Sequence, residues 1–239
     1  MSQKIVLFFV LGLFIFGNTQ AQNWESIKGE GKVITQEIKL ENIHGVSLGI
    51  SGKLILTQGN TQRITIEGQQ NIIDNIKRET RGGHWNIEFD KNVKDAEPIT
   101  VTITLPQLDE IGLGGSGTIT STNKFNGLDD LEINISGSGH LEFDFDAKET
   151  EVNLSGSAKA IITGASPKLE INISGSGNVT AKDLTAASCE IAISGSGDAA
   201  VNVNGDLSAS ISGSGDVTYR GKANVDAAVS GSGSVTKVQ

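Results

Sequence analysis

Apolar and polar residues alternate along the second half of this chain, and a Ser-Gly-Ser-Gly sequence interrupts the alternation at regular intervals. In "LEINISGSGHLEFDF" (residues 131–145), Ile133 and Ile135 precede the interruption, and Leu141 and Phe143 follow it. A period of two is typical of a β-strand with one buried face. Each repeat therefore predicts one strand that runs into a turn and one strand that leaves it.

These turns recur with a nearly constant spacing. Their first glycines are Gly115, Gly137, Gly156, Gly175, Gly195, Gly213 and Gly231, separated by 22, 19, 19, 20, 18 and 18 residues. A serine follows each glycine, at Ser116, Ser138, Ser157, Ser176, Ser196, Ser214 and Ser232. A period in this range marks a solenoid or an array of repeats. The last repeat is predicted to bury Ala227 and Val229 before its turn and Val235 after it.

Two all-β architectures fit such a repeat. In a β-helix-like solenoid each repeat is one coil and equivalent strands pair in parallel, whereas in a meander each repeat is a hairpin and the pairing is antiparallel. We favour the solenoid, because identical turns would then stack in one column and share one conformation. The antiparallel meander of hairpins stays open as the alternative.

The first half of the chain is β-rich but less regular. Strand patterns such as "RITIEG" and "ITVTITLP" are separated by irregular segments, and residues 69–79 have the apolar spacing of one short helix. A solenoid needs an atypical first part to cover its open end. We predict a single domain over residues 39–239, with an irregular half at 39–110 and a GSG-repeat half at 111–239.

The N-terminus has the pattern of a secretory signal peptide over residues 1–21. Lys4 precedes an apolar run from Ile5 to Phe16, and small residues surround a cleavage point after Ala21. The run is shorter than the roughly 20 residues that span a bilayer. We expect an exported protein, in the periplasm, on the outer-membrane surface or outside the cell, with a segment at 22–38 before the domain and no integral membrane segment after cleavage.

The charge and composition narrow the function classes. Removing Lys4 with the signal peptide leaves 18 basic and 28 acidic side chains, a net charge of −10. This field repels phosphates, so we expect no nucleic-acid partner. The single cysteine, Cys189, forms no intrachain disulfide, and its place in "SCEIAIS" predicts a small buried strand residue. The low aromatic content of 5% favours thin aliphatic layers and thus an elongated stack.

The polar positions of the repeats also recur in register. They form two series, Glu132, Glu151, Glu170 and Glu190, and then Asn134, Asn153 and Asn172. In a parallel stack these residues would form outward ladders with a spacing of about 4.8 Å. Carboxylates at that spacing repel one another, so we expect neighbouring groups to relieve the repulsion.

The glycine turns resemble several functional loops without matching any of them. "GLGGSG" at residues 112–117 lacks the following helix that a dinucleotide-binding loop needs. The serines lack a base for each copy, and only Asp198 and Asp216 could supply a repeated calcium turn. We therefore interpret the seven Gly-Ser pairs as structural turns and expect no cofactor, no bound metal and no catalytic serine among them.

One acidic strand face offers an enzymatic alternative. In "LEFDFDAKE", Glu142, Asp144 and Asp146 would share one outward face opposite three apolar residues. Paired carboxylates are the catalytic groups of glycoside hydrolysis. A solvated strand face explains the same pattern, so these residues are surface candidates rather than an assigned active site.

Three segments together resemble the auto-transporter adhesin head GIN domain family of exported bacterial proteins. They are "GVSLGISGKLILTQGNTQRITIEG", "PITVTITLPQLDEIGLGGSGTI" and the serial SGSG turns, and the resemblance covers about residues 39–239. It implies a β-helix-like fold with GSG motifs at tight turns, without the catalytic residues of pectin lyases. It also implies a role in cell adhesion and, by analogy with trimeric adhesins, a homo-trimer.

Taken together, the sequence predicts an exported, adhesion-like binding module that is not an enzyme and that binds a glycan or a protein at the cell surface. One alternative is a polysaccharide hydrolase or lyase that uses the acidic face. The other is a structural scaffold that oligomerises in the cell envelope.

The repeats also predict how the turn glycines differ. The first glycine never varies, so we expect a positive φ there and a loss above about 1 kcal/mol for Gly175→Ala. The second glycine is replaced by Ala158 in one repeat. We therefore expect Gly177→Ala to be mild.

Overall fold

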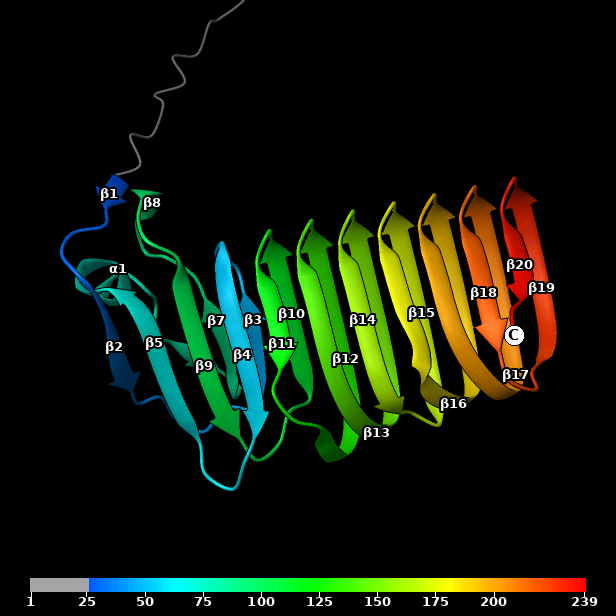
Figure 1. The fold of residues 1–239 in the computed structure, drawn as a ribbon, viewed down its shortest axis with the longest axis horizontal. Helices are drawn as coiled ribbons and strands as arrows, with labels where there is room; N and C mark the ends of the chain where they lie inside the picture. Colours follow the sequence, from blue (N-terminus) through cyan, green and yellow to red (C-terminus); the bar gives the residue numbers. More distant parts are fainter. Residues whose placement is uncertain (1–25) are drawn as a thin grey trace, which may run out of the picture.

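The computed structural model describes residues 26–239, which form an elongated β-solenoid (Figure 1). The predicted signal peptide lies outside the described residues. Successive coils stack along the long axis, and each coil contributes one strand to each of two faces. We call the face whose strands run toward the glycine turns the approach face, and the face whose strands leave them the return face.

The strands of the approach face pair with one another in parallel. In spatial order its strands are β7 (His84–Ile87), β3 (Gly45–Leu48), β10 (Glu110–Gly115), β12 (Phe125–Gly137), the second part of β13 (His140–Gly156), β15 (Lys168–Gly175), the second parts of β16 (Asn178–Gly195) and β17 (Asp198–Gly213), and β19 (Asn224–Gly231). Each strand is in parallel register with its neighbours, so equivalent residues form straight columns.

The return face follows the same rule after an antiparallel start. Its strands are β2 (Val33–Ile38), β5 (Arg63–Gln69), β9 (Ile99–Leu105), β4 (Gly52–Gln58), β11 (Thr118–Ser121), the first part of β13, β14 (Lys159–Ala165), the first parts of β16 and β17, β18 (Asp216–Arg220) and β20 (Ser234–Lys237). Only the β2–β5 and β5–β9 pairs of this face are antiparallel. The solenoid prediction is confirmed, and the antiparallel meander is wrong for the repeats.

The two corners of a coil differ in shape. At the glycine turn the chain reverses sharply, whereas at the opposite corner β13, β16 and β17 continue from one face to the other without a loop (Figure 1). The bend is taken up by register shifts, such as the one between Ala181 and Thr185. Extra residues in one strand increase its bend and twist. The coils of β13, β16 and β17 are therefore one long bent strand and one sharp turn each, whereas a short break separates β11 from β12, β14 from β15 and β18 from β19 at the same corner.

Backbone hydrogen bonds join the glycine turns into a column. The first glycine of every turn has a positive φ, from 83° at Gly115 to 133° at Gly213. The N–H of Ser138 donates to the carbonyl oxygen of Gly115 at 2.9 Å, and the N–H of Ser157 donates to that of Gly137 at 2.8 Å. The turn serines thus contribute their backbone N–H groups to this column.

The core is a thin double layer of inward-facing aliphatic side chains. Most inward positions of the repeats are fully buried, and the largest buried side chains are Trp85, Phe125 and Phe145. Cys189 is one of these inward residues, with 4% exposure. Burial raises the pKa of its thiol to about 12, with a smaller contribution from the charge of Glu190. The thiol is therefore a core group and not a nucleophile.

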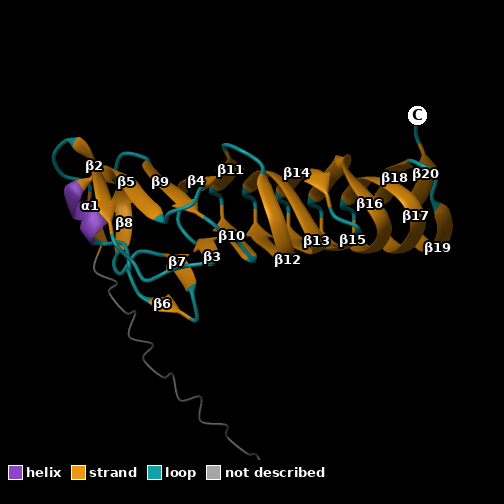
Figure 2. Cartoon of the chain, turned by 90° about the horizontal axis from the view of Figure 1, so that it is seen from below, coloured by secondary structure: helices purple, strands orange, loops and turns teal. Residues whose placement is uncertain are grey.

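An irregular cap covers the N-terminal end. It contains β1 (Ser26–Lys28) paired with β8 (Asn92–Asp95), the helix α1 (Gln70–Asp74), and β6 (Thr80–Arg81) beside β7. Figure 2 shows α1 at this end of the molecule beside β2. The predicted helix at 69–79 is present but spans only these five residues, and it buries Ile72 and Ile73. Residues 33–38, which precede the predicted domain, form β2 of the return face.

The C-terminal end lacks such a cover within residues 26–239. β19 and β20 form the last coil, and Val229 is 44% exposed although its column neighbour Ile211 is 1% exposed. The prediction that Ala227 and Val229 are buried is wrong. Both side chains point toward the interior, but no further coil packs on them.

Candidate functional site

The outer surface of the approach face carries the most ordered set of polar side chains. Parallel register places five glutamates, Glu110, Glu132, Glu151, Glu170 and Glu190, in one column across five strands. Neighbouring strands are about 4.8 Å apart, so these carboxylates repel one another. Four of the five were expected from the repeat, whereas Glu110 lies before the first regular coil and was missed.

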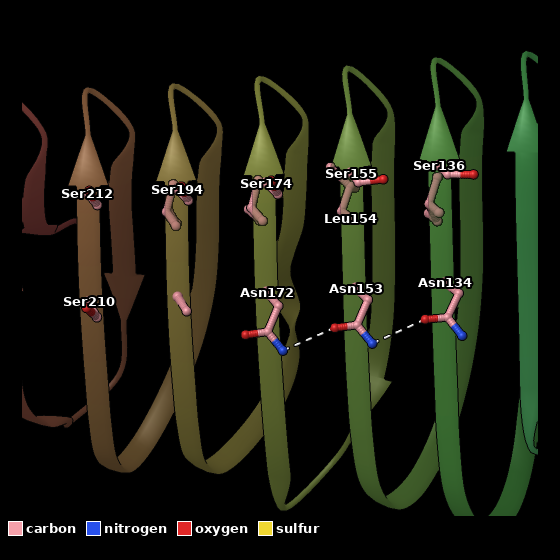
Figure 3. Close-up of a pocket in the computed structure, with 14 residues that line it drawn as sticks. Asn134, Ser136, Asn153, Leu154, Ser155, Asn172, Ser174, Ser194, Ser210 and Ser212 are labelled. Carbon is pink, nitrogen blue, oxygen red and sulfur yellow. Dashed lines mark hydrogen bonds between the residues drawn. The ribbon is translucent and has the colours of Figure 1, made fainter.

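Figure 3 shows a ladder of asparagine amides on the approach face. The amides also contact the glutamate column and so relieve part of this repulsion. Asn153 Nδ2 donates to Asn134 Oδ1 at 3.2 Å, and Asn172 Nδ2 donates to Asn153 Oδ1 at 3.1 Å. Each amide also donates to the glutamate two residues earlier, for example from Asn153 Nδ2 to Glu151 Oε1 at 2.8 Å. The strand alternation brings these two groups to the same face, so the ladder follows directly from the sequence pattern.

A shallow groove of about 570 Å³ follows this ladder toward the glycine turns. We call it the ladder groove. Its polar lining consists of Asn134, Asn153, Asn172, Ser136, Ser155, Ser174, Ser194, Ser210 and Ser212. Its lining serines include the leading serines of several turns and none of the seven serines that follow the first glycines. The groove therefore offers rows of neutral hydroxyl and amide groups over several coils.

A second groove of about 490 Å³ lies on the same face, farther from the turns. We call it the acidic groove. Its charged lining is Asp109, Glu110, Asp130, Glu132, Glu149, Glu151, Glu170 and Lys168, together with His44 and His84. Lys168 Nζ contacts Glu149 Oε2 at 2.7 Å, and this hydrogen bond and the Glu149 charge raise the pKa of Lys168. The acidic groove favours neutral or cationic ligands over anionic ones.

The fold also brings Ser47, His84 and Glu110 together, although they are distant in sequence. His84 Nε2 lies 2.9 Å from Ser47 Oγ, and His84 Nδ1 lies 2.9 Å from Glu110 Oε2. A serine, a base and an acid in this order occur in hydrolases. However, the His84–Glu110 contact is out of line for a hydrogen bond. β3, which carries Ser47, is paired on both sides, so its own N–H groups are committed to the sheet and not to an oxyanion.

The acidic triplet proposed from the sequence lies on the return face, on the outward side of β13. Glu142 Oε1 contacts His140 Nε2 at 2.8 Å, and Asp146 Oδ1 contacts Lys124 Nζ at 2.5 Å. Asp144 lies between them, and its backbone N–H donates to Ser121 Oγ at 3.0 Å. Two of the three carboxylates are thus engaged by a neighbouring base, and none of the three lines the ladder groove or the acidic groove.

Among residues 26–239, no three His, Cys, Asp or Glu side chains converge in a way that could hold a metal ion. Within the same residues, every helix is too short or too polar to cross a bilayer.

The chain matches the family described as "Putative auto-transporter adhesin, head GIN domain" over residues 42–223. A search of curated proteins finds no significant match. Among solved structures, a putative adhesin from Bacteroides fragilis is 23% identical, with a TM-score of 0.82 over 89% of this chain and 100% of that chain.

Two solved structures from Parabacteroides have the same fold. A putative lipid binding protein from Parabacteroides distasonis is 24% identical, with a TM-score of 0.76 over 90% of this chain and 100% of that chain. A putative adhesin from Parabacteroides merdae is 20% identical, with a TM-score of 0.69 over 90% and 99% of the two chains. At these identities the likeness concerns the fold.

Proposed function

Because this chain belongs to the auto-transporter adhesin head GIN domain family, we propose that it is an exported, non-catalytic binding module with an adhesion-like role. The predicted signal peptide supports export to the cell envelope or beyond. The ladder groove is lined by amide, hydroxyl and aliphatic side chains and by no carboxylate or histidine, which suits binding rather than turnover. The binding surface in this proposal is the ladder groove.

The ladder groove is proposed as the binding surface because the same amide and hydroxyl groups recur in it from coil to coil. Asn134, Asn153 and Asn172 hold one another in place, and the Nδ2 groups of Asn153 and Asn172 use both hydrogens within the ladder and toward the glutamates. The remaining lone pairs of the amide oxygens are therefore held in fixed positions for a ligand. Rows of hydroxyl and amide groups suit a ligand that itself repeats, such as a polysaccharide chain. Each repeat contributes a weak contact, and the contacts of several coils add on one chain.

The adjacent charges narrow the ligand class. The acidic groove borders the ladder groove from β12 to β15, and Glu190 continues the glutamate column to β16, whereas the ladder groove extends to Ser210 and Ser212 of β17. Anionic polysaccharides are repelled by this border, whereas neutral or amino-sugar glycans are not. We therefore propose a neutral or amino-sugar glycan as the ligand of the ladder groove.

Glycan-array binding of the purified protein, with groove-blocking variants, tests this proposal. Ser155→Trp fills the middle of the ladder groove from an exposed position, so we expect it to abolish binding. Thr180→Trp makes a comparable change on the return face and should leave binding intact. Equal binding by both variants, or a preference for polyanionic glycans, would contradict the proposed surface.

A reducing-end assay on the bound glycans separates binding from hydrolysis. We expect no new reducing ends over hours of incubation. Turnover that is abolished by Asp144→Ala would instead identify the acidic triplet as catalytic. Turnover abolished by Ser47→Ala and covalent labelling of that serine by a fluorophosphonate would identify the Ser47–His84 pair.

A further inference from the structure

The two ends of the solenoid differ in how they finish the core. At the N-terminal end, α1 buries Ile72 and Ile73 completely, with 0% exposure. At the other end, the inward column Ile193, Ile211 and Val229 changes from 2% and 1% exposure to 44%. The last coil therefore leaves an apolar interior position open to solvent.

The backbone edges of the last coil are also open within the described residues. β19 pairs with β17 on one side, and β20 pairs with β18 on one side. The outer edges of these two strands present unpaired N–H and C=O groups, which are a template for another strand. Proteins often protect such edges with proline or several charges, but β19 has no proline and one charged side chain, Asp226.

The charge of this end favours contact between like molecules. The whole chain has a net charge of −9, whereas residues 221–239 carry only Lys222, Asp226 and Lys237. Two copies of an acidic protein repel each other over most of their surfaces. At their C-terminal ends this repulsion is small.

We propose that the C-terminal end binds the same end of a second copy, so that two solenoids join end to end around a two-fold axis. At the N-terminal end α1 covers the interior, but the outer edge of β2 is unpaired within the described residues, and Val33 and Ile34 are exposed there. Head-to-tail contact through this edge would not close at two molecules and would give longer assemblies, which sedimentation distinguishes from a dimer. A two-fold interface uses the same surface on both copies and closes at two molecules. β19 of one copy then pairs antiparallel with β19 of the other, and the two β20 strands meet in the same way.

In one register of the β19–β19 pair, inward side chains face inward side chains and no two like charges face each other. If the axis passes through Ala228, this residue faces its own copy on the outer surface. Ala227 then faces Val229 of the partner subunit, and Asp226 faces Ser230 of the partner subunit. Inward side chains meet inward side chains, so the apolar interior continues across the junction.

The area of the junction sets the expected strength. A strand of eight residues is roughly 26 Å long, and two sheets with their outer side chains are about 20 Å thick. Each copy therefore buries about 500 Å², or about 1,000 Å² in total, which is the lower end for a specific interface. We expect a reversible dimer in the micromolar range rather than a permanent one.

Sedimentation equilibrium of the purified protein from about 5 to 500 µM tests the proposal, with a range chosen for micromolar association. Ala228→Asp places two carboxylates opposite each other at the axis and should raise the dimer dissociation constant by at least roughly tenfold. Ala192 is exposed and lies in the same column as Ala228, but on an inner coil. Ala192→Asp should therefore leave the dimer dissociation constant of the unmodified protein unchanged. A monomer throughout the range, a trimer, or equal effects of the two variants would overturn the proposal.

Disulfide cross-linking gives a second test, which traps the proposed dimer instead of weakening it. In an antiparallel pair, directly opposed residues are close enough for a disulfide. Ala228→Cys should form a covalent dimer under mild oxidation, whereas Ala192→Cys should stay monomeric on a non-reducing gel. Buried Cys189 is present in both variants and is a common background. Cross-linking of both variants, or of neither, would reject this two-fold contact.

Discussion

Gly175 is the residue on which the turn column depends most directly. Its φ is 117°, and a Cβ there would lie 2.6 Å from the carbonyl oxygen of Gly156 in the preceding turn. Gly175→Ala therefore combines backbone strain with a clash against backbone. We expect a loss of about 2–3 kcal/mol in the free energy of unfolding, measured by denaturant titration.

Gly177 has less space around it than the natural Ala158 at the same position of the preceding turn suggests. A Cβ on Gly177 would clash with Leu154 Cδ2 and would lie 2.8 Å from the carbonyl oxygen of Ala158. This geometry argues against a mild effect of Gly177→Ala, because the Leu154 side chain and the Ala158 carbonyl oxygen fill the space that a Cβ would need. Its loss should be intermediate, since Leu154 can adjust but the carbonyl cannot.

Ala158→Gly is the matched control for these two glycines. It removes a methyl group from a residue with 1% exposure and should cost about 1 kcal/mol. The expected order of loss is Gly175→Ala, then Gly177→Ala, then Ala158→Gly. A loss for Gly177→Ala that equals or exceeds that of Gly175→Ala would show that positive φ is not the dominant requirement.

At the scale of the element, the asparagine ladder makes each strand depend on the next. Asn153→Ala removes donations to Asn134 and Glu151 and an acceptor for Asn172, so we expect a loss of about 0.5–1.5 kcal/mol. The reciprocal change, Ala192→Asn, extends the ladder and gives Glu190 an amide partner. It should stabilise the fold by a few tenths of a kcal/mol, as measured by thermal unfolding. If neither change altered the stability, the asparagine ladder would be a by-product of the sequence repeat without a stabilising role.

The strands and turns of the repeats could be predicted because each obeys a local rule. The alternation of apolar and polar residues predicts which face of a strand is buried, and the invariant first glycine predicts a positive φ at the turn. The continuous bend of β13, β16 and β17 could not be predicted, because no single residue type marks a corner that bulges can form. The approach-face column was found only in part, since Glu110 joins it through parallel register. Ser47 and His84 meet only in three dimensions, and no spacing in the sequence indicates their contact.

At the scale of the molecule, stability is distributed along one axis. Each coil contacts only its neighbours, so the same substitution should have different effects in different coils. Val217 and Val235 occupy one inward column, but Val217 is fully buried and Val235 lies in the last coil. We expect a loss of about 1–3 kcal/mol for Val217→Ala and of less than about 1 kcal/mol for Val235→Ala in denaturant titration. Equal losses would show that the last coil is covered in solution.

The direction of the hydrogen bonds has a mechanical consequence. The bonds that join successive coils run along the long axis, so a pull along this axis loads them one coil after another. Release of one coil of 18–22 residues lengthens the chain by roughly 60–70 Å. A solenoid held at its N-terminal end and bound to a surface near its other end would extend in steps of this size. Such steps absorb work before the whole molecule unfolds.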